Sequence, residues 1–267
     1  MLKFCTLLSG SSGNAVYCGT EEEGILLDCG VSGRQVLAAM AAKGLNPATL
    51  RAVLITHDHV DHTKGAGILS RKLNIPIYAT AGTWRVMDRT VGAVADPNRV
   101  TIAADASFFL NSMEILPFTT PHDAAEPVGY RVFAREGSVA VATDLGHFSP
   151  AVRGSLEGVD VVLLESNHDI EMLNRNPCYP ESLKKRILGN KGHLSNPSSG
   201  AAAVQLLAKG TRHFLLGHLS PDNNTPELAR ETVLNILLQS GAEENGDFTL
   251  RVAPRFAPSC SYLLGEE

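Results

Sequence analysis

The chain has 267 residues, of which 44% are hydrophobic and 19% are charged, as is ordinary for a globular protein with a sizeable core. Its formal net charge of −5 argues against general adhesion to nucleic acid or anionic membranes, but it leaves room for a local basic surface. No apolar stretch approaches the ~20 residues that span a bilayer, and the N-terminus lacks a signal-peptide layout. The five cysteines form no CxxC pair, which favours reduced thiols in a cytoplasm.

The first part of the chain alternates short apolar runs with turns and amphipathic helices. Gly33 to Lys43 is expected to form a helix that Gly44 ends as a C-terminal cap. Further helices are predicted near Lys64–Leu73 and Gly82–Val91, and strands at Lys3–Leu8, Ala15–Cys18, Ile25–Asp28, Ala52–Thr56 and Ile75–Ala79.

The second part returns to strands and then adds two helices. Strands are predicted at Met113–Thr120, Val128–Arg135, Ser138–Thr143, Val161–Glu165 and Phe214–Gly217. After Glu165 comes a polar, Asn- and Pro-containing region, then a helix from Pro197 to Lys209 with Asn196 as its N-cap. A last helix opens at Thr225. This order predicts one α/β domain, residues 1–267, with two sheets and outer helices.

Four potential metal ligands lie within six positions, directly after an apolar strand. They are His57, His59, Asp61 and His62. Clustered imidazoles and a carboxylate in apolar surroundings are costly unless a cation pairs them. The run therefore predicts a metal site, and its donors suit zinc, manganese or iron.

Three more candidate ligands follow later strands, namely His122, Asp144 and His218. Each alone is weak evidence, since polar residues are common at strand ends. Together with the histidine run they supply enough donors for two metal ions. Two ions about 3.5–4 Å apart can share a hydroxide that is nucleophilic near neutrality, which predicts a hydrolase.

The order HxHxDH, His, Asp, His, each after a strand, resembles the metallo-β-lactamase superfamily over nearly the whole chain. The resemblance implies an αββα sandwich, with two facing mixed sheets, outer helices and the metals at one edge. It also implies that His57, His59 and His122 bind one divalent ion, that Asp61, His62 and His218 bind the other, and that Asp144 bridges them. Asp28 matches the early-strand aspartate that supports the metal loop by hydrogen bonding.

Three segments resemble the YycJ (WalJ) group within that superfamily: residues 9–14 with 28–30, residues 164–173, and residues 192–196. The last also resembles the His-x-Ser/Thr element of the RNase Z and RNase J nucleases. The resemblance implies a 5′-to-3′ exonuclease that acts on the ends of double-stranded DNA, as in DNA repair. The oligomeric state, the pathway, the native metal and the choice of DNA over RNA cannot be read from the residues.

His193 precedes a helix N-terminus, where backbone N–H groups favour a phosphate. By analogy with RNase Z, Glu165 would orient His193 as a general acid, so that Asp61, Glu165 and His193 carry catalysis. His193 could instead only cap its helix, and the lysines near it could form a solvated face. The substrate contacts expected here are His168, Ser195, Asn196, Lys185 and Lys191.

Two other functions stay open from the sequence. A hydrolase of thioesters, lactones or β-lactams would use the same fold but would have no role for the Glu165–His193 pair. A metal-binding regulatory protein would belong to another class, and the complete set of seven ligands argues against it.

Overall fold

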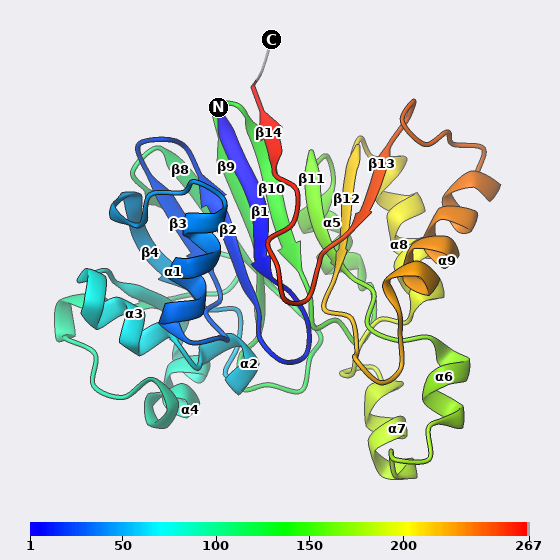
Figure 1. Cartoon of the computed structure of the whole chain (residues 1–267), viewed down its shortest axis with the longest axis horizontal. Helices are drawn as coiled ribbons and strands as arrows, with labels where there is room; N and C mark the ends of the chain where they lie inside the picture. The colour runs from blue at the N-terminus through cyan, green and yellow to red at the C-terminus, as the bar shows by residue number, and fades with distance from the viewer. Residues whose placement is uncertain (266–267) are drawn as a thin grey trace. The chain divides into compact units, whose positions relative to one another are not determined.

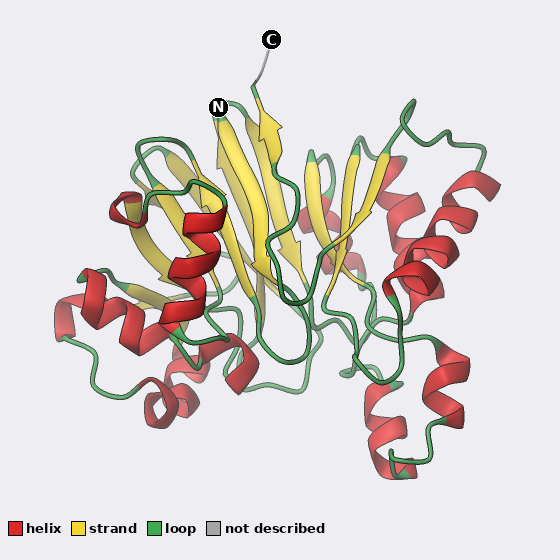
Figure 2. Ribbon diagram, in the orientation of Figure 1, coloured by secondary structure: helices red, strands yellow, loops and turns green. Residues whose placement is uncertain are grey.

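Residues 1–265, the part that the computed structural model describes, contain two mixed sheets of seven strands each, with helices beside them (Figure 2). The predicted α/β class with two mixed sheets is confirmed. The chain divides into two compact units. The first contains residues 1–118, 124–137 and the segment from Pro254 onward, and the second contains residues 119–123 and 138–253. A single domain over residues 1–267 stays a prediction.

The first unit contains one complete sheet, with the strand order β14-β1-β2-β3-β4-β5-β6. Strands β1 to β3 and β14 pair antiparallel, whereas β3 to β6 pair parallel. The strands are β1 (Leu2–Leu8), β2 (Ala15–Gly19), β3 (Gly24–Leu27), β4 (Leu50–Leu54), β5 (Ile77–Thr80), β6 (Arg99–Ile102) and β14 (Tyr262–Leu264). Three strands of the other sheet follow β6 in the chain: β7 (Phe108–Leu110), β8 (Met113–Thr119) and β9 (Val128–Ala134).

Helix α1 lies over β1 to β3 in Figure 1 and buries an apolar face against them. Val36 and Met40 of α1 are fully buried in a core that includes Leu26 and Trp84. Ser32 and Gln35 form a capping box at its start. The helices of this unit are α1 (Gly33–Ala42), α2 (Val60–Thr63), α3 (Ala66–Leu73) and α4 (Ala81–Val91), with 3₁₀ turns at Pro47–Thr49 and Asp96–Asn98.

The second unit contains four parallel strands in the order β10-β11-β12-β13. They are β10 (Gly137–Ala142), β11 (Val161–Glu165), β12 (His213–Gly217) and β13 (Thr249–Val252). Helices α8 and α9 pack on each other, and Gly200 of α8 allows this because an added β-carbon would lie 2.6 Å from Ile236 of α9 (Figure 1). The helices are α5 (Pro150–Leu156), α6 (Ile170–Arg175), α7 (Glu181–Ile187), α8 (Asn196–Leu207) and α9 (Pro226–Gln239).

Several sequence-based boundaries were wrong. The polar region after β11 contains two short helices, α6 and α7. The N-cap of α8 is Ser195 rather than Asn196, because the Ser195 hydroxyl accepts a hydrogen bond from the backbone N–H of Ser198. Strand β3 ends before Asp28, which has a left-handed backbone, and β4 ends before Thr56. No helix among the described residues is long and apolar enough to cross a membrane.

The loop after β4 is held by backbone contacts to the loops after β1 and β3. The N–H of Cys29 donates to the carbonyl of His62 at 2.8 Å, and the N–H of Asn14 donates to the carbonyl of Asp61 at 2.9 Å. Gly30 lies so close to this loop that an added β-carbon would be 1.5 Å from the Asp61 carbonyl oxygen. Only glycine fits this position without moving the histidine run.

We expect Gly30→Ala to lower the free energy of unfolding by about 1–3 kcal/mol, because the new methyl group must displace backbone atoms. Urea denaturation followed by circular dichroism measures the change. Gly154→Ala in α5 is the matched control, because a β-carbon there meets no atom within 4 Å. Equal stability of Gly30→Ala and wild type would contradict the close packing of the two loops.

Candidate functional site

The first half of the candidate site is the loop that follows β4 in the first unit. The His57 ring centroid lies 4.6 Å from that of His59 and 4.1 Å from that of His62. His57 and His62 are buried, and the Asp61 side chain is 26% exposed. The loop therefore brings three imidazoles and one accessible carboxylate together, a donor set that suits a divalent transition metal.

The buried Asp28 side chain holds this loop by hydrogen bonds. Its carboxylate accepts from the backbone N–H of Thr56 at 2.8 Å and from the Thr56 hydroxyl at 2.9 Å. It also lies 2.7 Å from Nδ1 of His62. A His62 ring that donates from Nδ1 to Asp28 presents the lone pair of Nε2, the atom that lies 3.5 Å from Asp61 Oδ2. Asp28 therefore sets both the tautomer and the orientation of His62, and its support of a metal ligand stays a prediction.

Asn14 also contacts this loop, and the sequence did not single it out as a site residue. Its side-chain amide lies 3.2 Å from Nε2 of His62, and its N–H bonds the Asp61 carbonyl. Its carbonyl in turn accepts from the N–H of Gly30 at 2.8 Å. The sequence signal is the turn that ends in Asn14, which resembled the YycJ group but had no assigned partner.

The second half of the candidate site lies in the second unit, where strands β10, β11 and β12 end. Donor atoms of Asp144, Glu165, His193 and His218 all lie within 4.8 Å of one another. One Asp144 oxygen, Oδ1, is 3.6 Å from nitrogens of His193, His218 and His122. The sequence-predicted strand-end residues of this unit thus form one cluster.

Glu165 is the centre of that cluster. Its fully buried carboxylate accepts from Nδ1 of both His193 and His218 at 2.8 Å, and from the backbone N–H groups of Leu145 at 2.8 Å and Leu194 at 3.0 Å. Burial alone would raise the pKa of Glu165, but the charge and hydrogen bond of His193 and the bond from His218 lower it to about 2. Glu165 therefore stays ionised and fixes two imidazoles at once.

Three candidate site residues have a left-handed backbone, which is uncommon for residues with a side chain. They are Asp28, Asp144 and His218, with φ of 61°, 60° and 55°. Each follows a buried strand within two residues. Strained backbone that persists at several strand ends is typical of sites where side-chain direction matters.

The structure gives the expected substrate contacts different environments. Asn196 is fully buried, where its amide bonds Ser166 and Asn224, and Ser195 caps α8. His168 is 1% exposed, and among the described residues neither ring nitrogen has a hydrogen-bond partner. Burial lowers the pKa of His168 to about 4, so the ring is neutral at pH 7. Substrate contact by these three residues stays a prediction.

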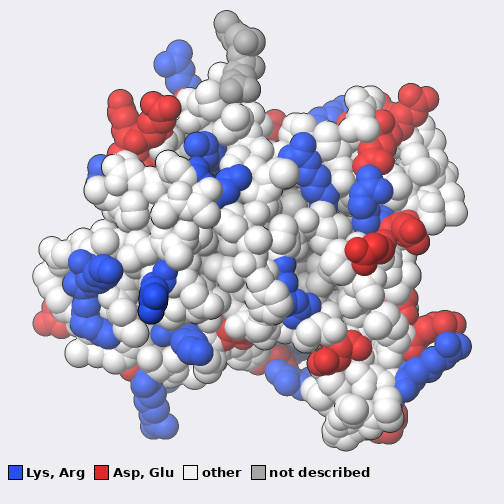
Figure 3. Space-filling model, in the orientation of Figure 1, with Lys and Arg blue, Asp and Glu red and all other residues white. Residues whose placement is uncertain are grey.

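The basic run near α7 is only partly available to a ligand; it consists of Lys184, Lys185, Arg186 and Lys191. Lys184 is 8% exposed, and its ammonium donates to the Asn174 carbonyl at 2.7 Å. Arg186 forms an ion pair with Asp123. Lys185 and Lys191 are exposed. The positive charge open to solvent in this run therefore comes mainly from these two lysines, and Figure 3 shows Lys and Arg dispersed over the visible face.

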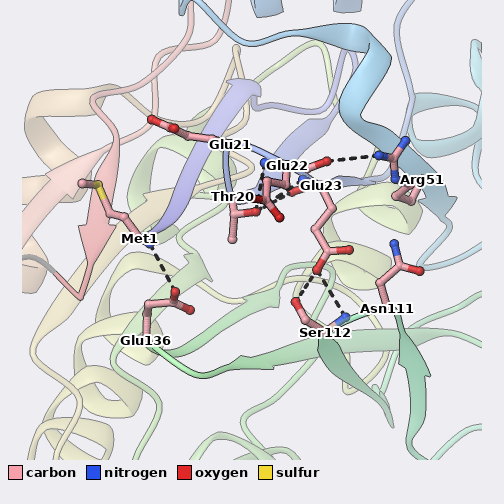
Figure 4. Close-up of a pocket in the computed structure, with 9 residues that line it drawn as sticks. All are labelled: Met1, Thr20, Glu21, Glu22, Glu23, Arg51, Asn111, Ser112 and Glu136. Carbon is pink, nitrogen blue, oxygen red and sulfur yellow. Dashed lines mark hydrogen bonds and ion pairs between the residues drawn. The ribbon is translucent and has the colours of Figure 1, made fainter.

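A separate pocket of about 780 Å³ lies in the first unit, away from the candidate metal loop (Figure 4). The turn between β2 and β3 lines it, at the opposite end of these strands from Asp28. Glu136 pairs there with the N-terminal ammonium at 3.2 Å, and Glu23 bonds Ser112. Its lining residues are Met1, Thr20, Glu21, Glu22, Glu23, Arg51, Asn111, Ser112 and Glu136. The four carboxylates outnumber the two cationic groups, the N-terminal ammonium and Arg51, so the pocket disfavours phosphates and does not suit a nucleic acid.

Known proteins resemble this chain in sequence and in fold. A family model described as a β-lactamase superfamily domain matches residues 24–219. Exodeoxyribonuclease YycJ of Bacillus anthracis is 38% identical over 90% of each chain. Exodeoxyribonuclease WalJ of Streptococcus pneumoniae serotype 2 (strain D39) is 37% identical over 92% of each chain.

A solved structure supports the fold assignment independently. The metallo-β-lactamase fold protein YhfI from Bacillus subtilis matches with a TM-score of 0.73 and 14% identity, over 98% of this chain and 100% of that one. At this identity the likeness concerns the fold alone. The fold predicted from the sequence is confirmed, and the chain belongs to the β-lactamase superfamily.

Proposed function

We propose that this protein is a metal-dependent phosphodiesterase that degrades double-stranded DNA from its ends, in the 5′-to-3′ direction. Superfamily membership and the two exodeoxyribonuclease relatives identify a metal-dependent hydrolase. The observation that carries the choice of a phosphodiester is the Glu165–His193 pair, because it supplies a proton donor for the alkoxide oxygen that leaves a phosphodiester, whereas the thiolate of a thioester leaves without protonation.

The donor sets described above fit two divalent cations, with Zn²⁺, Mn²⁺ or Fe²⁺ as the candidates. When bound, the cations would activate water as the nucleophile and compensate the charge of the phosphate. The residues proposed to hold them are His57, His59, Asp61, His62, His122, Asp144 and His218. Asp61 has a partly exposed carboxylate that lies 3.5 Å from Nε2 of His62, so we propose it as a catalytic residue as well as a ligand.

His193 would protonate the leaving oxygen. Its Nδ1 bonds Glu165, which directs Nε2 away from that carboxylate. Burial would lower the pKa of His193, but the charge and hydrogen bond of Glu165 raise it above its usual value. The Glu165 carboxylate therefore favours the protonated form, which a general acid needs, more than the surroundings of a free imidazole would.

The chain as a whole is acidic, so DNA binding would depend on local positive charge. We propose that the exposed Lys185 and Lys191 contact the DNA backbone, since they are the solvent-exposed lysines of the basic run near α7. Such contacts are independent of base sequence and weaken with salt.

Incubation with linear duplex DNA, labelled at either the 5′ or the 3′ end, tests the proposal. Wild type with Mn²⁺ or Zn²⁺ is expected to release 5′-labelled mononucleotides early, and a chelator should stop the reaction. Asp61→Ala should abolish cleavage, and His193→Ala should lower kcat by about 10²–10⁴, the usual range for loss of a general acid. His213→Gln is the matched histidine control at the far end of β12 and should leave the rate unchanged.

Two results would overturn the proposal. One is an intact duplex with every metal while a thioester or a β-lactam is hydrolysed. The other is full activity of Asp61→Ala, which would show that the histidine run is not part of the active site.

Asp28→Asn is expected to weaken metal binding about 10- to 100-fold, because it disturbs the carboxylate that orients His62. Competition with a fluorescent chelator measures the affinity. Asp88→Asn is the control, since Asp88 forms an exposed ion pair with Arg99. Unchanged metal affinity in Asp28→Asn would show that His62 is oriented by other contacts.

A further inference from the structure

An arginine and an exposed phenylalanine lie next to each other in the segment that leads into β14. Phe256 is 81% exposed, the highest value among the large hydrophobic residues that the structure describes. The Arg255 guanidinium lies 5.9 Å from the centre of the Phe256 ring. Single exposed apolar residues are common on protein surfaces, so the position of this pair in the fold decides whether it has a role.

The segment is anchored beside the end of β1. Strand β14 pairs antiparallel with β1, and the N–H of Ser259 donates to the carbonyl of Thr6 at 2.9 Å. The Ser259 hydroxyl accepts from the N–H of Thr6 at 3.0 Å. The segment before β14, which contains these two residues, therefore continues past Thr6 toward the end of β1 that leads into the turn of residues 9–14 (Figure 1).

Arg255 packs across that turn. A β-carbon on Gly10 would be 3.4 Å from Cγ of Arg255 and 3.5 Å from its guanidinium carbon. The N–H of Gly10 donates to the side chain of Asn14 at 3.0 Å, and Asn14 contacts Asp61 and His62. Within the first unit, a continuous series of contacts thus joins Arg255 to the candidate metal loop.

We propose that Arg255 and Phe256 bind the terminal nucleotide of the DNA substrate, a proposal that rests on the exonuclease function proposed above. The guanidinium pairs with a phosphate, and the ring stacks on a base that has left the duplex. Together they would attract an unpaired DNA end locally, although the net charge of the chain, −5, repels DNA.

A protein partner is the competing occupant. Phe256 also borders a groove of about 340 Å³ whose other lining residues include Ala38, Ala42 and Pro258. Nucleic acid is favoured because the arginine beside the ring provides charge complementarity to a phosphate, and because the pair is continuous with the loop that holds Asp61.

Steady-state cleavage of a duplex with a short 5′ overhang tests the stacking role. Phe256→Ala should raise KM by about fivefold to 100-fold, the range that loss of one stacked base implies, whereas Phe256→Tyr should stay near wild type. On a duplex whose overhang is abasic, wild type and Phe256→Ala should have equal KM, because the ring has no base to contact.

Arg255→Met tests the phosphate contact, because methionine keeps an apolar stem against Gly10 and removes the charge. The slope of log KM against log salt should fall by about one unit, as for loss of one phosphate contact. Phe109→Ala and Arg51→Met are the matched controls. Phe109 is 71% exposed on β7, and Arg51 lines the acidic pocket of Figure 4. Both controls should behave as wild type.

The outcomes separate the two proposals. A wild-type protein that cleaves no DNA refutes the exonuclease function itself. A wild type that cleaves DNA, with KM and salt slope unchanged in both variants, refutes only the role of Arg255 and Phe256. A Phe256→Ala effect that persists on abasic ends, or a changed oligomeric state without a change in KM, would assign this face to another contact.

Discussion

A carboxylate removed from water must be compensated by hydrogen bonds or by opposite charge, and both units use their candidate site histidines for this purpose. In the first unit, Asp28 is 1% exposed and is satisfied by Thr56 and His62. In the second, Glu165 is fully buried and is satisfied by His193, His218 and two backbone N–H groups. The same bonds that stabilise the buried charge also orient the imidazoles that are proposed to bind metal or move a proton.

The position of the site residues at the ends of parallel strands is the second feature on which the site depends. Parallel strands end at the same edge of a sheet, so polar residues placed directly after them come together without any local sequence relation. Asp144, Glu165 and His218 follow or end β10, β11 and β12 and form one cluster. The left-handed backbone at Asp144 and His218 turns the chain sharply there, and the surrounding hydrogen bonds hold that strained geometry.

Charged side chains are distributed unevenly within each unit. The acidic pocket of the first unit disfavours phosphates, whereas the half-buried Arg255 lies against the turn of residues 9–14 and the exposed Lys185 and Lys191 lie in or after α7. An acidic protein that acts on DNA would avoid general adhesion and bind only where cations are local. The basic run illustrates that counting charges is insufficient, since Lys184 and Arg186 are used in structural contacts.

The sequence by itself determined the α/β class, most central strands and the histidine run, because buried strands and ligand spacing are local patterns. It did not predict edge strands such as β13 and β14 or the short helices α6 and α7, since so few residues carry little periodicity and their conformation depends on packing. Only the tertiary structure decided that Gly30 must be glycine, that Asn196 is buried, and that Glu165 bonds two histidines. Each of these facts joins residues far apart in the chain, and such contacts arise only when the strands have been assembled into sheets.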